Sequence, residues 1–451
     1  MFAKFKIMGL FVALMLFSGL ARAIPDIETW TTENGAEVMF VYSNGLPMVD
    51  IRVLFDAGSA RDNGLSGLAV MTNGLLAEGA GDLSAQELAE RFESVGAQFE
   101  NDSLRDMAIV GVRSLTDKAY LDTALATMST VLSKPDFNQQ EFERELARMK
   151  VAVTAKKQSP STIAEEAFYK AIYGDHPYAS PSDGTEESLE KMNLEAIKAF
   201  YQQYYVASNA LIVMVGAIEK PQAQAIAHQI SMGLDRGVKP AAIPEVPQLK
   251  EKQLVRIQYP SKQAHIFVGQ PGMKRGDKDY FSLYIANHAF GGSGFASRLM
   301  EAIREDRGLA YSVYSYFMPM REAGPFMMGM QTRADQADQA VSLLQSELEK
   351  YIAEGPDEDE IKDSISNVVG GFPLDLDSNS KLLGYLAMIG FYHLPGNYLN
   401  KFVDNIESVG RADARKTMAR RIDPERLVTV IVGDLTATAD GNTGNTQGEA
   451  Q

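Results

Sequence analysis

The chain has 451 residues, 45 % of them hydrophobic, and no cysteine, so it forms no disulfide and must be held together by packed cores. A chain of this length fits two large domains. The formal net charge is −16, which argues against nucleic acid and anionic membrane surfaces as partners.

Residues 1–23 have the pattern of a secretory signal peptide. Lys4 and Lys6 precede an apolar stretch from Ile7 to Leu20, and the small-residue cleavage pattern ARA follows. We therefore expect an exported protein, periplasmic or secreted. No later segment approaches a membrane span in length, and a thioether lipid anchor would need a cysteine, so we expect no membrane association after cleavage.

The chain changes character at residues 237–249, where GVKPAAIPEVPQL gathers three prolines without helical periodicity. We interpret this segment as a linker between an N-terminal domain at 24–236 and a C-terminal domain at 250–434. Residues 435–451 are small and polar, and we expect them to form a disordered tail.

The two halves share a pattern that indicates internal duplication. Each closes on a β-branched run, ALIVMVG at 210–216 and LVTVIVG at 427–433, which is typical of a buried strand. Near the start of each half, Ile51–Phe55 and His265–Gly269 are strand-like and lead through a polar turn into a helical pattern. Mixed strands and helices indicate layered α/β or α+β domains with helices packed on a sheet.

A helix is predicted over GLAVMTNGLLAEG at 67–79, with Ser66 as its N-cap. In this setting of strand, turn and helix, the segment DAGSARDNGLSGLAVMTNGLLAEGAGDLSAQELAERFESVGAQF resembles the pitrilysin and mitochondrial-processing-peptidase family of zinc peptidases. The resemblance covers most of the mature chain. It implies the α+β class, with two homologous domains that each pack helices on a mixed, largely antiparallel sheet and together form half of a clam-like peptidase.

In that family the helix carries an inverted zinc motif, H-x-x-E-H, in which two histidines bind zinc and the glutamate activates water. The matching positions here are Val70, Asn73 and Gly74. None of these side chains can bind zinc or accept a proton from water. The family's third ligand is a glutamate on a downstream helix, where this chain has Val151 and Ala152. We therefore expect no metal at this site.

The histidines do not suggest another metal site. They show no paired ligand spacing, and we interpret them as isolated surface or core residues: His176, His228, His265, His288 and His393. The sequence also contains no G-x-S-x-G elbow and no P-loop.

A glycine loop opens the segment NHAFGGSGFASRLMEAIREDRGLAYSVYSYF. Gly291, Gly292 and Gly294 could expose backbone amides to a substrate chain, and the alternative is an ordinary loop before a helix. A helix is then predicted from Ala296 to Arg307, followed by a strand from Leu309 to Phe317.

Arg304 lies in the last turn of this predicted helix and Tyr311 early in the strand. The family carries an arginine and a tyrosine at this spacing, in a context like RE-x-x-GL-x-Y. The resemblance implies that the pair reaches across a chamber to a zinc site and donates hydrogen bonds to the substrate backbone and oxyanion. Alternatively, Arg304 interacts with the helix dipole and Tyr311 packs on a sheet, although Arg307, nearer Gly308, could be the dipole partner.

These patterns lead to one leading hypothesis and two others. The leading hypothesis is the zinc-free subunit of a heterodimeric exported peptidase that degrades peptides, in which Arg304 and Tyr311 complete the zinc site of a homologous partner. Residues 96–112 resemble the family's edge strand, which holds a peptide by strand addition, or they form a plain sheet strand. The main alternative is a catalytically inactive binding or scaffold protein. A peptidase that acts alone through other ligands is not expected.

Overall fold

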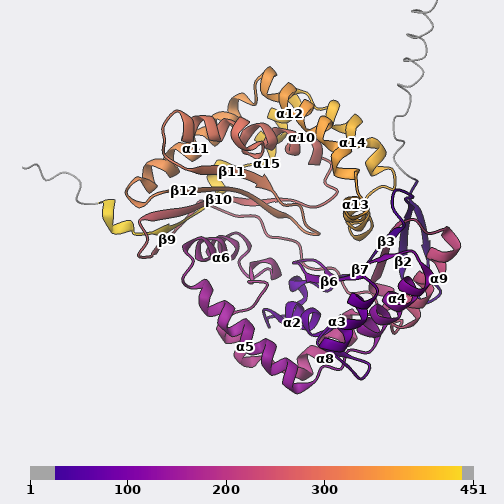
Figure 1. Ribbon diagram of the computed structural model, residues 1–451. Helices are drawn as coiled ribbons and strands as arrows, with labels where there is room; N and C mark the ends of the chain where they lie inside the picture. Colours follow the sequence, from indigo (N-terminus) through magenta and orange to yellow (C-terminus); the bar gives the residue numbers. More distant parts are fainter. Residues whose placement is uncertain (1–25, 439–451) are drawn as a thin grey trace, which may run out of the picture.

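The computed structural model describes residues 26–438, so the predicted signal peptide lies outside the described residues. The chain forms two mixed sheets, each packed with helices (Figure 1). This confirms the predicted α+β class. No helix between residues 26 and 438 is long and apolar enough to cross a membrane.

The first sheet has six strands in the order β1-β2-β8-β3-β7-β6, of which only β2 and β8 pair in parallel. Its strands are β1 (Glu28–Thr31), β2 (Glu37–Tyr42), β3 (Met48–Phe55), β6 (Gln98–Ser103), β7 (Ala108–Leu115) and β8 (Ala210–Gly216). The central strand β8 is buried along its whole length, as its β-branched run predicts. At the free edge, β6 alternates exposed and half-buried residues.

The second sheet has five strands in the order β11-β12-β10-β13-β9, of which only β13 and β9 pair in parallel. Its strands are β9 (Gln253–Gln258), β10 (Gln263–Met273), β11 (Ser312–Phe317), β12 (Gly324–Arg333) and β13 (Val428–Gly433). Like β8, β13 is buried throughout, and each of the two strands pairs in parallel with one neighbour and antiparallel with the other.

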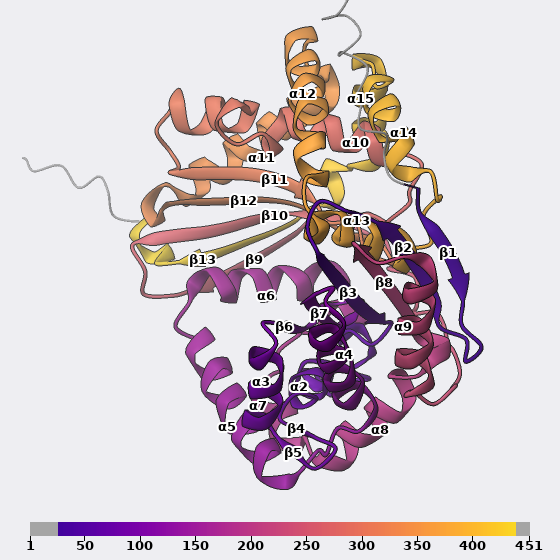
Figure 2. The same cartoon turned by 45° about the vertical axis from the view of Figure 1, so that its right-hand side comes forward.

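Most helices cover the sheet of their own half (Figures 1 and 2). Those of the first half are α2 (Leu68–Leu75), α3 (Ala85–Ser94), α4 (Lys118–Ser133), α5 (Gln139–Lys156), α7 (Glu186–Lys191), α8 (Leu194–Tyr204) and α9 (Lys220–Met232). Those of the second half are α10 (Tyr280–Asn287), α11 (Ala337–Glu354), α12 (Glu358–Gly371), α14 (Tyr398–Glu407) and α15 (Arg411–Arg421).

Two helices are exchanged between the halves. Helix α6 (Pro160–Tyr173) belongs to the first half but packs on β10 and β13 of the second sheet, where Phe168 joins the core formed by Val428 and Val430. Conversely, α13 (Asn379–Phe391) packs on β8 and β3 of the first sheet. Figure 2 shows α6 beneath the second sheet and α13 beside β3 and β8. Each half therefore completes its core with a helix from the other.

Between α9 and β9 the chain forms neither helix nor strand, consistent with the predicted linker, yet it is firmly attached. Ile243 and Val246 are buried in the same core as α6. The tail differs from its prediction at one end, because Leu435–Thr438 form a short 3-10 helix and Leu435 packs against the second-half core. The rest of the predicted tail lies outside the described residues.

A buried aspartate joins the two halves. Asp106, in the turn between β6 and β7, is 3 % exposed. Its carboxylate accepts hydrogen bonds from Tyr178 Oη at 2.5 Å, from Tyr392 Oη at 3.0 Å and from the backbone N–H of Arg321 at 2.7 Å. The last two partners come from the second half, so one carboxylate ties three distant segments together.

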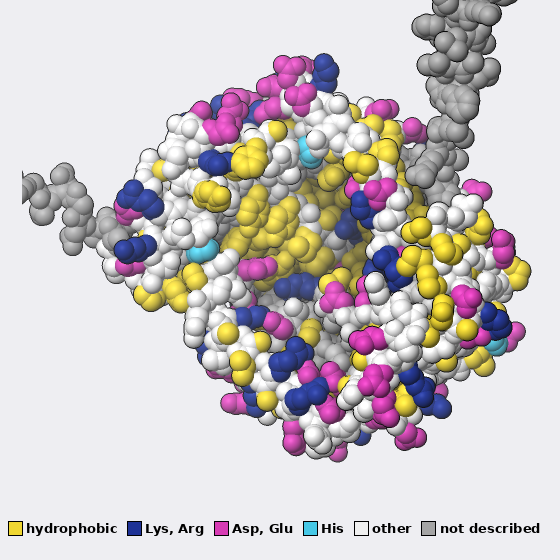
Figure 3. Space-filling model, in the orientation of Figure 1, with side chains coloured by type: hydrophobic (Ala, Val, Ile, Leu, Met, Phe, Trp, Pro, Cys, Tyr) yellow, Lys and Arg dark blue, Asp and Glu magenta, His cyan; other side chains and the backbone are white. Residues whose placement is uncertain are grey.

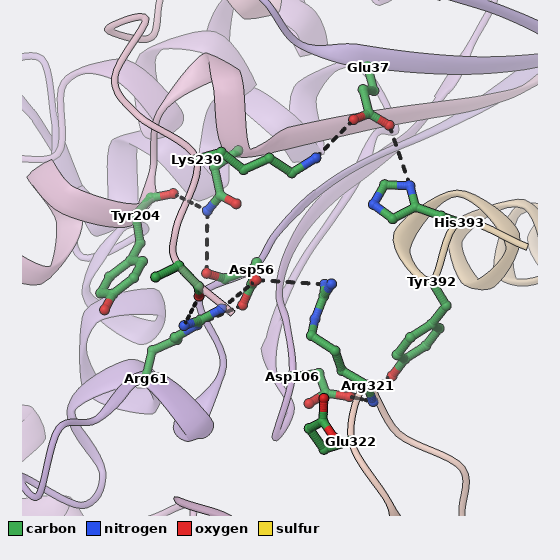
Figure 4. Close-up of polar contacts among 12 residues, drawn as sticks. Glu37, Asp56, Arg61, Asp106, Tyr204, Lys239, Arg321, Glu322, Tyr392 and His393 are labelled. Carbon is green, nitrogen blue, oxygen red and sulfur yellow. Dashed lines mark hydrogen bonds and ion pairs between the residues drawn. The ribbon is translucent and has the colours of Figure 1, made fainter. Parts of the chain in front are cut away.

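A second polar cluster lies beside the first (Figure 4). Arg61 donates to both carboxylate oxygens of Asp56 and to the carbonyl of Ala241 in the linker. Arg321 of the second half approaches Asp56 at 3.7 Å. Lys239 pairs with Glu37 at 3.1 Å. These contacts bind the linker to the first half and hold the halves in one relative orientation.

Candidate functional site

The face seen in Figure 3 is hollowed between the two halves, and hydrophobic side chains line the hollow together with some charged ones. The residues predicted to form the site lie in both halves. The degenerate metal positions are on α2 and α5 of the first half, and the arginine–tyrosine pair precedes β11 of the second.

Helix α2 carries Val70, Asn73 and Gly74, which the resemblance matches to H-x-x-E-H. It is shorter than predicted, and Asp62 rather than Ser66 caps it, since the Asp62 carboxylate accepts from the N–H groups of Gly67 and Ala69. Burial raises the pKa of Asp62 to about 7, against the effect of these two hydrogen bonds.

The position of the catalytic glutamate has a structural side chain instead. Asn73 is 2 % exposed, and its amide donates to the carbonyl of Ile109 at 3.2 Å and to Tyr205 Oη at 3.1 Å. The carbonyl of Asn73 accepts from Asn101 of the edge strand β6 at 2.8 Å. Val70 packs against the first-half core, and Gly74 has open space where a side chain would stand. Asn73 therefore links α2 to the sheet.

Helix α5 packs against α2, as expected for a helix that would supply a further ligand. The positions of that ligand are apolar, and Val151 is 70 % exposed. Ala152 is exposed as well. Two nearby carboxylates pair with arginines of α5: Glu78, which follows α2, pairs with Arg144, and Glu145 of α5 pairs with Arg148.

Between residues 26 and 438, no group of three His, Cys, Asp or Glu side chains is placed to hold a metal ion. Val70, Asn73, Gly74, Val151 and Ala152 do not fit zinc, because none offers an imidazole, thiolate or carboxylate. The histidines also lie apart: His176 is fixed by the linker, His228 is on α9 and His265 on β10. His288 begins the glycine loop, and His393 follows α13.

Arg304 and Tyr311 lie together. The guanidinium of Arg304 stands 5.6 Å from the centre of the Tyr311 ring and 4.8 Å from that of Phe295. Tyr311 is 83 % exposed and Phe295 72 %. The arginine is thus stacked with two exposed rings, in the geometry of a cation–π contact.

In the alternative interpretation Arg304, which lies in the last turn of its helix, interacts with the helix dipole. Arg307, not Arg304, donates to a carbonyl at the end of the helix, that of Ala302, at 2.6 Å. Tyr311 is too exposed to be packed on the sheet. Both side chains are therefore available to a ligand. Sequence reasoning missed Phe295, although an aromatic residue in a glycine loop is a signal that could have identified it.

The helix that carries Arg304 is irregular. Met300–Glu305 form a π-helical turn, in which the N–H of Asp306 bonds to the carbonyl of Glu301 at 3.0 Å. Gly308 follows in the left-handed conformation (φ 62°), as predicted for the residue that ends the helix. Such π-turns are frequent at functional sites, and this one sets the direction in which Arg304 leaves the backbone.

The glycine loop is more ordered than the flexible loop we expected. Gly291 is buried in a second π-helical turn, His288–Gly292, and a Cβ there would stand 2.3 Å from Ser315 Oγ of β11. A Cβ on Gly292 would meet the Asn287 amide at 3.0 Å. Of these three glycines, only Gly294 has a left-handed backbone conformation (φ 63°), which favours glycine. Gly291 is therefore required for close packing between the loop and β11.

Known sequences and structures share this architecture. Residues 38–186 match the family described as insulinase (peptidase family M16), and residues 191–368 match its peptidase M16 inactive domain. A crystal structure of a peptidase M16 inactive domain from Pseudomonas fluorescens is similar at a TM-score of 0.88 and 35 % identity, over 90 % of this chain and 98 % of that chain.

Curated relatives differ in their descriptions. The non-peptidase homolog YmxG of Helicobacter pylori is 25 % identical over 429 residues, which are 93 % of this chain and 97 % of that protein. The uncharacterized zinc protease YmxG of Bacillus subtilis is 26 % identical over 358 residues, 79 % of this chain and 86 % of that protein. Together with the two sheets and their exchanged helices, these similarities show that the chain belongs to peptidase family M16.

Proposed function

We propose that this chain is the zinc-free subunit of a heterodimeric exported peptidase that degrades peptides. In this proposal a homologous partner with the H-x-x-E-H motif holds zinc, and Arg304 and Tyr311 of this chain reach into the partner's site. The observation that carries the proposal is the exposed, mutually stacked Arg304–Tyr311 pair in a chain whose own metal positions have no ligands.

The chemistry of the pair suits this role. The Arg304 guanidinium offers several N–H donors, and the Tyr311 phenol offers an O–H donor. Two such donors, held in place before the substrate arrives, stabilise negative charge that develops on a peptide carbonyl oxygen. Stacking on Phe295 restricts the rotamers of Arg304 in advance, which reduces the entropy lost on binding.

The free edge of β6 supports the peptide-binding part of the proposal. β6 pairs with β7 on one side only, so its other edge can accept a peptide as a further strand. Asn101 of β6 is bonded to Asn73 of α2, so a peptide on this edge lies beside the degenerate metal positions.

A second candidate function is a catalytically inactive peptide-binding or scaffold protein. It is supported by the descriptions of two relatives, a non-peptidase homolog from Helicobacter pylori and a peptidase M16 inactive domain from Pseudomonas fluorescens. Both candidates share the peptide-binding edge, and they differ in whether a partner needs Arg304 and Tyr311.

Co-expression separates the two candidates. This chain and an M16 chain with an intact H-x-x-E-H motif are produced alone and together, and each sample is assayed with a quenched fluorescent peptide library. Peptidase activity that requires both chains supports the subunit proposal. The subunit proposal is rejected if the partner alone is fully active, or if replacing Arg304 and Tyr311 leaves the activity of the mixture unchanged. Either result favours the binding or scaffold protein.

A further inference from the structure

A pocket of about 490 Å³ lies along the free edge of β11, outside the Arg304–Tyr311 pair. One wall is the glycine loop with α10, and the other is β11 itself. The lining residues are mostly aromatic or polar and include no acidic side chain: Met273, Arg275, Tyr280, Tyr284, Asn287, His288, Gly291, Gly292, Gly294, Tyr314, Ser315, Tyr316, Phe317 and Pro319.

Arg275 is the cation of this pocket. Its guanidinium stands 5.8 Å from the Tyr280 ring centre and 5.7 Å from that of Tyr392. Among residues 26–438 no carboxylate forms an ion pair with Arg275, whereas the neighbouring Lys274 pairs with Glu245 and Glu322. The Nε atom of Arg275 is buried without a hydrogen-bond partner among these residues. A half-buried guanidinium with an unsatisfied N–H is costly to maintain, and arginine forks match carboxylates especially well.

A second unsatisfied polar atom lies on the same pocket. His288 Nε2 is 3.3 Å from Asn367 Oδ1. Because an amide oxygen only accepts, Nε2 carries the proton and Nδ1 is left as an acceptor. Nδ1 is buried and has no partner within the described part of the chain. Both orphaned atoms are covered by protein, whereas the terminal Nη groups of Arg275 are not among the buried unpartnered atoms and lie at the pocket wall.

The aromatic residues suit the rest of such a ligand. Tyr314 and Tyr316 stack in parallel at 5.9 Å, and Tyr280 and Tyr284 do so at 5.8 Å. Burial raises the pKa of Tyr284, Tyr314 and Tyr316, so their hydroxyls stay neutral at physiological pH. The walls therefore offer apolar faces and hydroxyl donors but no competing negative charge.

We propose that this pocket binds a carboxylate-bearing end or side chain of a peptide. Arg275 takes the carboxylate through its Nη groups, and the tyrosine faces hold an apolar side chain. That the ligand is a peptide rests on the proposed function. Its negative charge is inferred from the pocket itself, in a protein whose overall charge of −16 would otherwise repel acids.

Binding to this chain alone tests the proposal without any partner. Three acetylated peptides are titrated calorimetrically: Ala-Ala-Phe with a free carboxylate, the same peptide as its amide, and Ala-Glu-Phe amide. We expect the amide of Ala-Ala-Phe to bind at least about tenfold more weakly than the acid, as for loss of a charge-assisted hydrogen bond. Tight binding of Ala-Glu-Phe amide identifies a side chain as the source of the carboxylate, and its absence identifies the peptide terminus.

Variants of Arg275 test whether this residue supplies the positive charge that binds the carboxylate. Arg275→Gln should weaken binding of the preferred acid about tenfold or more, and Arg275→Lys should weaken it less. Arg333→Gln, which removes one charge from an exposed pair with Asp335, should leave binding unchanged. If Arg275→Gln does not fold, binding is measured with Arg275→Lys, which should still bind the preferred acid more weakly than the unaltered chain.

The proposal is overturned if no acid binds at millimolar concentration. It is also overturned if the three peptides bind equally, or if Arg275→Gln binds the preferred acid like the unaltered chain. None of these results depends on peptidase activity. A failure here is thus distinct from a failure of the co-expression assay.

Discussion

The Arg304 guanidinium lies 5.6 Å from the centre of the Tyr311 ring, and neither side chain is used to close the helix or pack the sheet. The helix end is satisfied separately by Arg307. A cation and a phenol that perform no structural task, yet are held next to each other, are suited to contact another molecule.

Replacing this pair should change activity without changing stability. In the complex with an active partner, Arg304→Ala and Tyr311→Phe are each expected to lower kcat/KM for peptide cleavage about 10²–10³-fold, as for loss of one oxyanion donor. The free energy of unfolding should stay within about 0.5 kcal/mol of the unaltered value, because Tyr311 is exposed.

Arg307→Ala is the matched control on the same helix. It removes the hydrogen bond to the Ala302 carbonyl and should cost about 0.5–1 kcal/mol of stability while kcat/KM is retained. Equal losses of activity in Arg304→Ala and Arg307→Ala would mean that helix integrity, not a specific donor, is being measured.

Asp106 should contribute strongly to the free energy of unfolding, because it joins the two halves. Asp106→Ala leaves three buried donors unsatisfied, so we expect the free energy of unfolding to fall by on the order of 3 kcal/mol. Tyr392→Phe loses one of these bonds and should cost about 1–2 kcal/mol. Asp122→Ala, which removes an exposed pair with Lys118, should cost under about 0.5 kcal/mol in the same urea titration. A small effect at Asp106 would argue against a rigid junction.

His176 should make folding sensitive to acid. Burial lowers its pKa, and the neutral ring accepts from the Tyr178 N–H at 3.1 Å and donates to the Pro244 carbonyl at 2.9 Å. Below about pH 6.5 the unfolded chain takes up a proton that the folded chain does not, so its contribution to stability is lost as the pH falls. Asp62 acts in the opposite direction, because its raised pKa lets the folded chain bind a proton first as the pH falls below about 7.

The comparison of variants separates these effects. Between about pH 8 and pH 5, the free energy of unfolding should fall less in His176→Gln than in the unaltered chain, because the variant lacks the imidazole that titrates. His228→Gln, at an exposed position on α9, should follow the unaltered chain over the same range. If the free energy of unfolding of His176→Gln has the same pH dependence as that of the unaltered chain, the His176 ring does not contribute to acid sensitivity.

The sequence predicts some of these features well and others not at all. The continuous apolar runs of β8 and β13 could be assigned as buried central strands, and Gly308 as the end of a helix, because each depends on local chemistry. The exchange of α6 and α13 could not be predicted. An apolar face shows that a helix is buried, but it does not show which sheet covers it.

The candidate site divides in the same way. The resemblance to the family indicated Arg304 and Tyr311 as a pair, whereas their shared contact with Phe295 is visible only in the structure. Arg275 gave no signal, because a lone arginine in a turn is ordinary in any sequence. Its distinction is the lack of an ion-pair partner within residues 26–438, and that depends on segments as distant as Tyr392.

Restoring the family's glutamate should destabilise this chain. Asn73→Glu removes the donors to Ile109 and Tyr205 and places a carboxylate beside the Ile109 carbonyl, which can only accept. We expect a loss of about 3 kcal/mol or more at neutral pH, measured by denaturant titration, and a smaller loss near pH 4 where the carboxyl is protonated in both states. Gly74→Ala on the same helix, where a Cβ meets nothing within 4 Å, should instead gain about 0.5–1 kcal/mol. If Asn73→Glu were as stable as the unaltered chain, the position would still be open to the family's chemistry; a large loss means that the asparagine has become part of the core, and that this half cannot regain catalysis by one substitution.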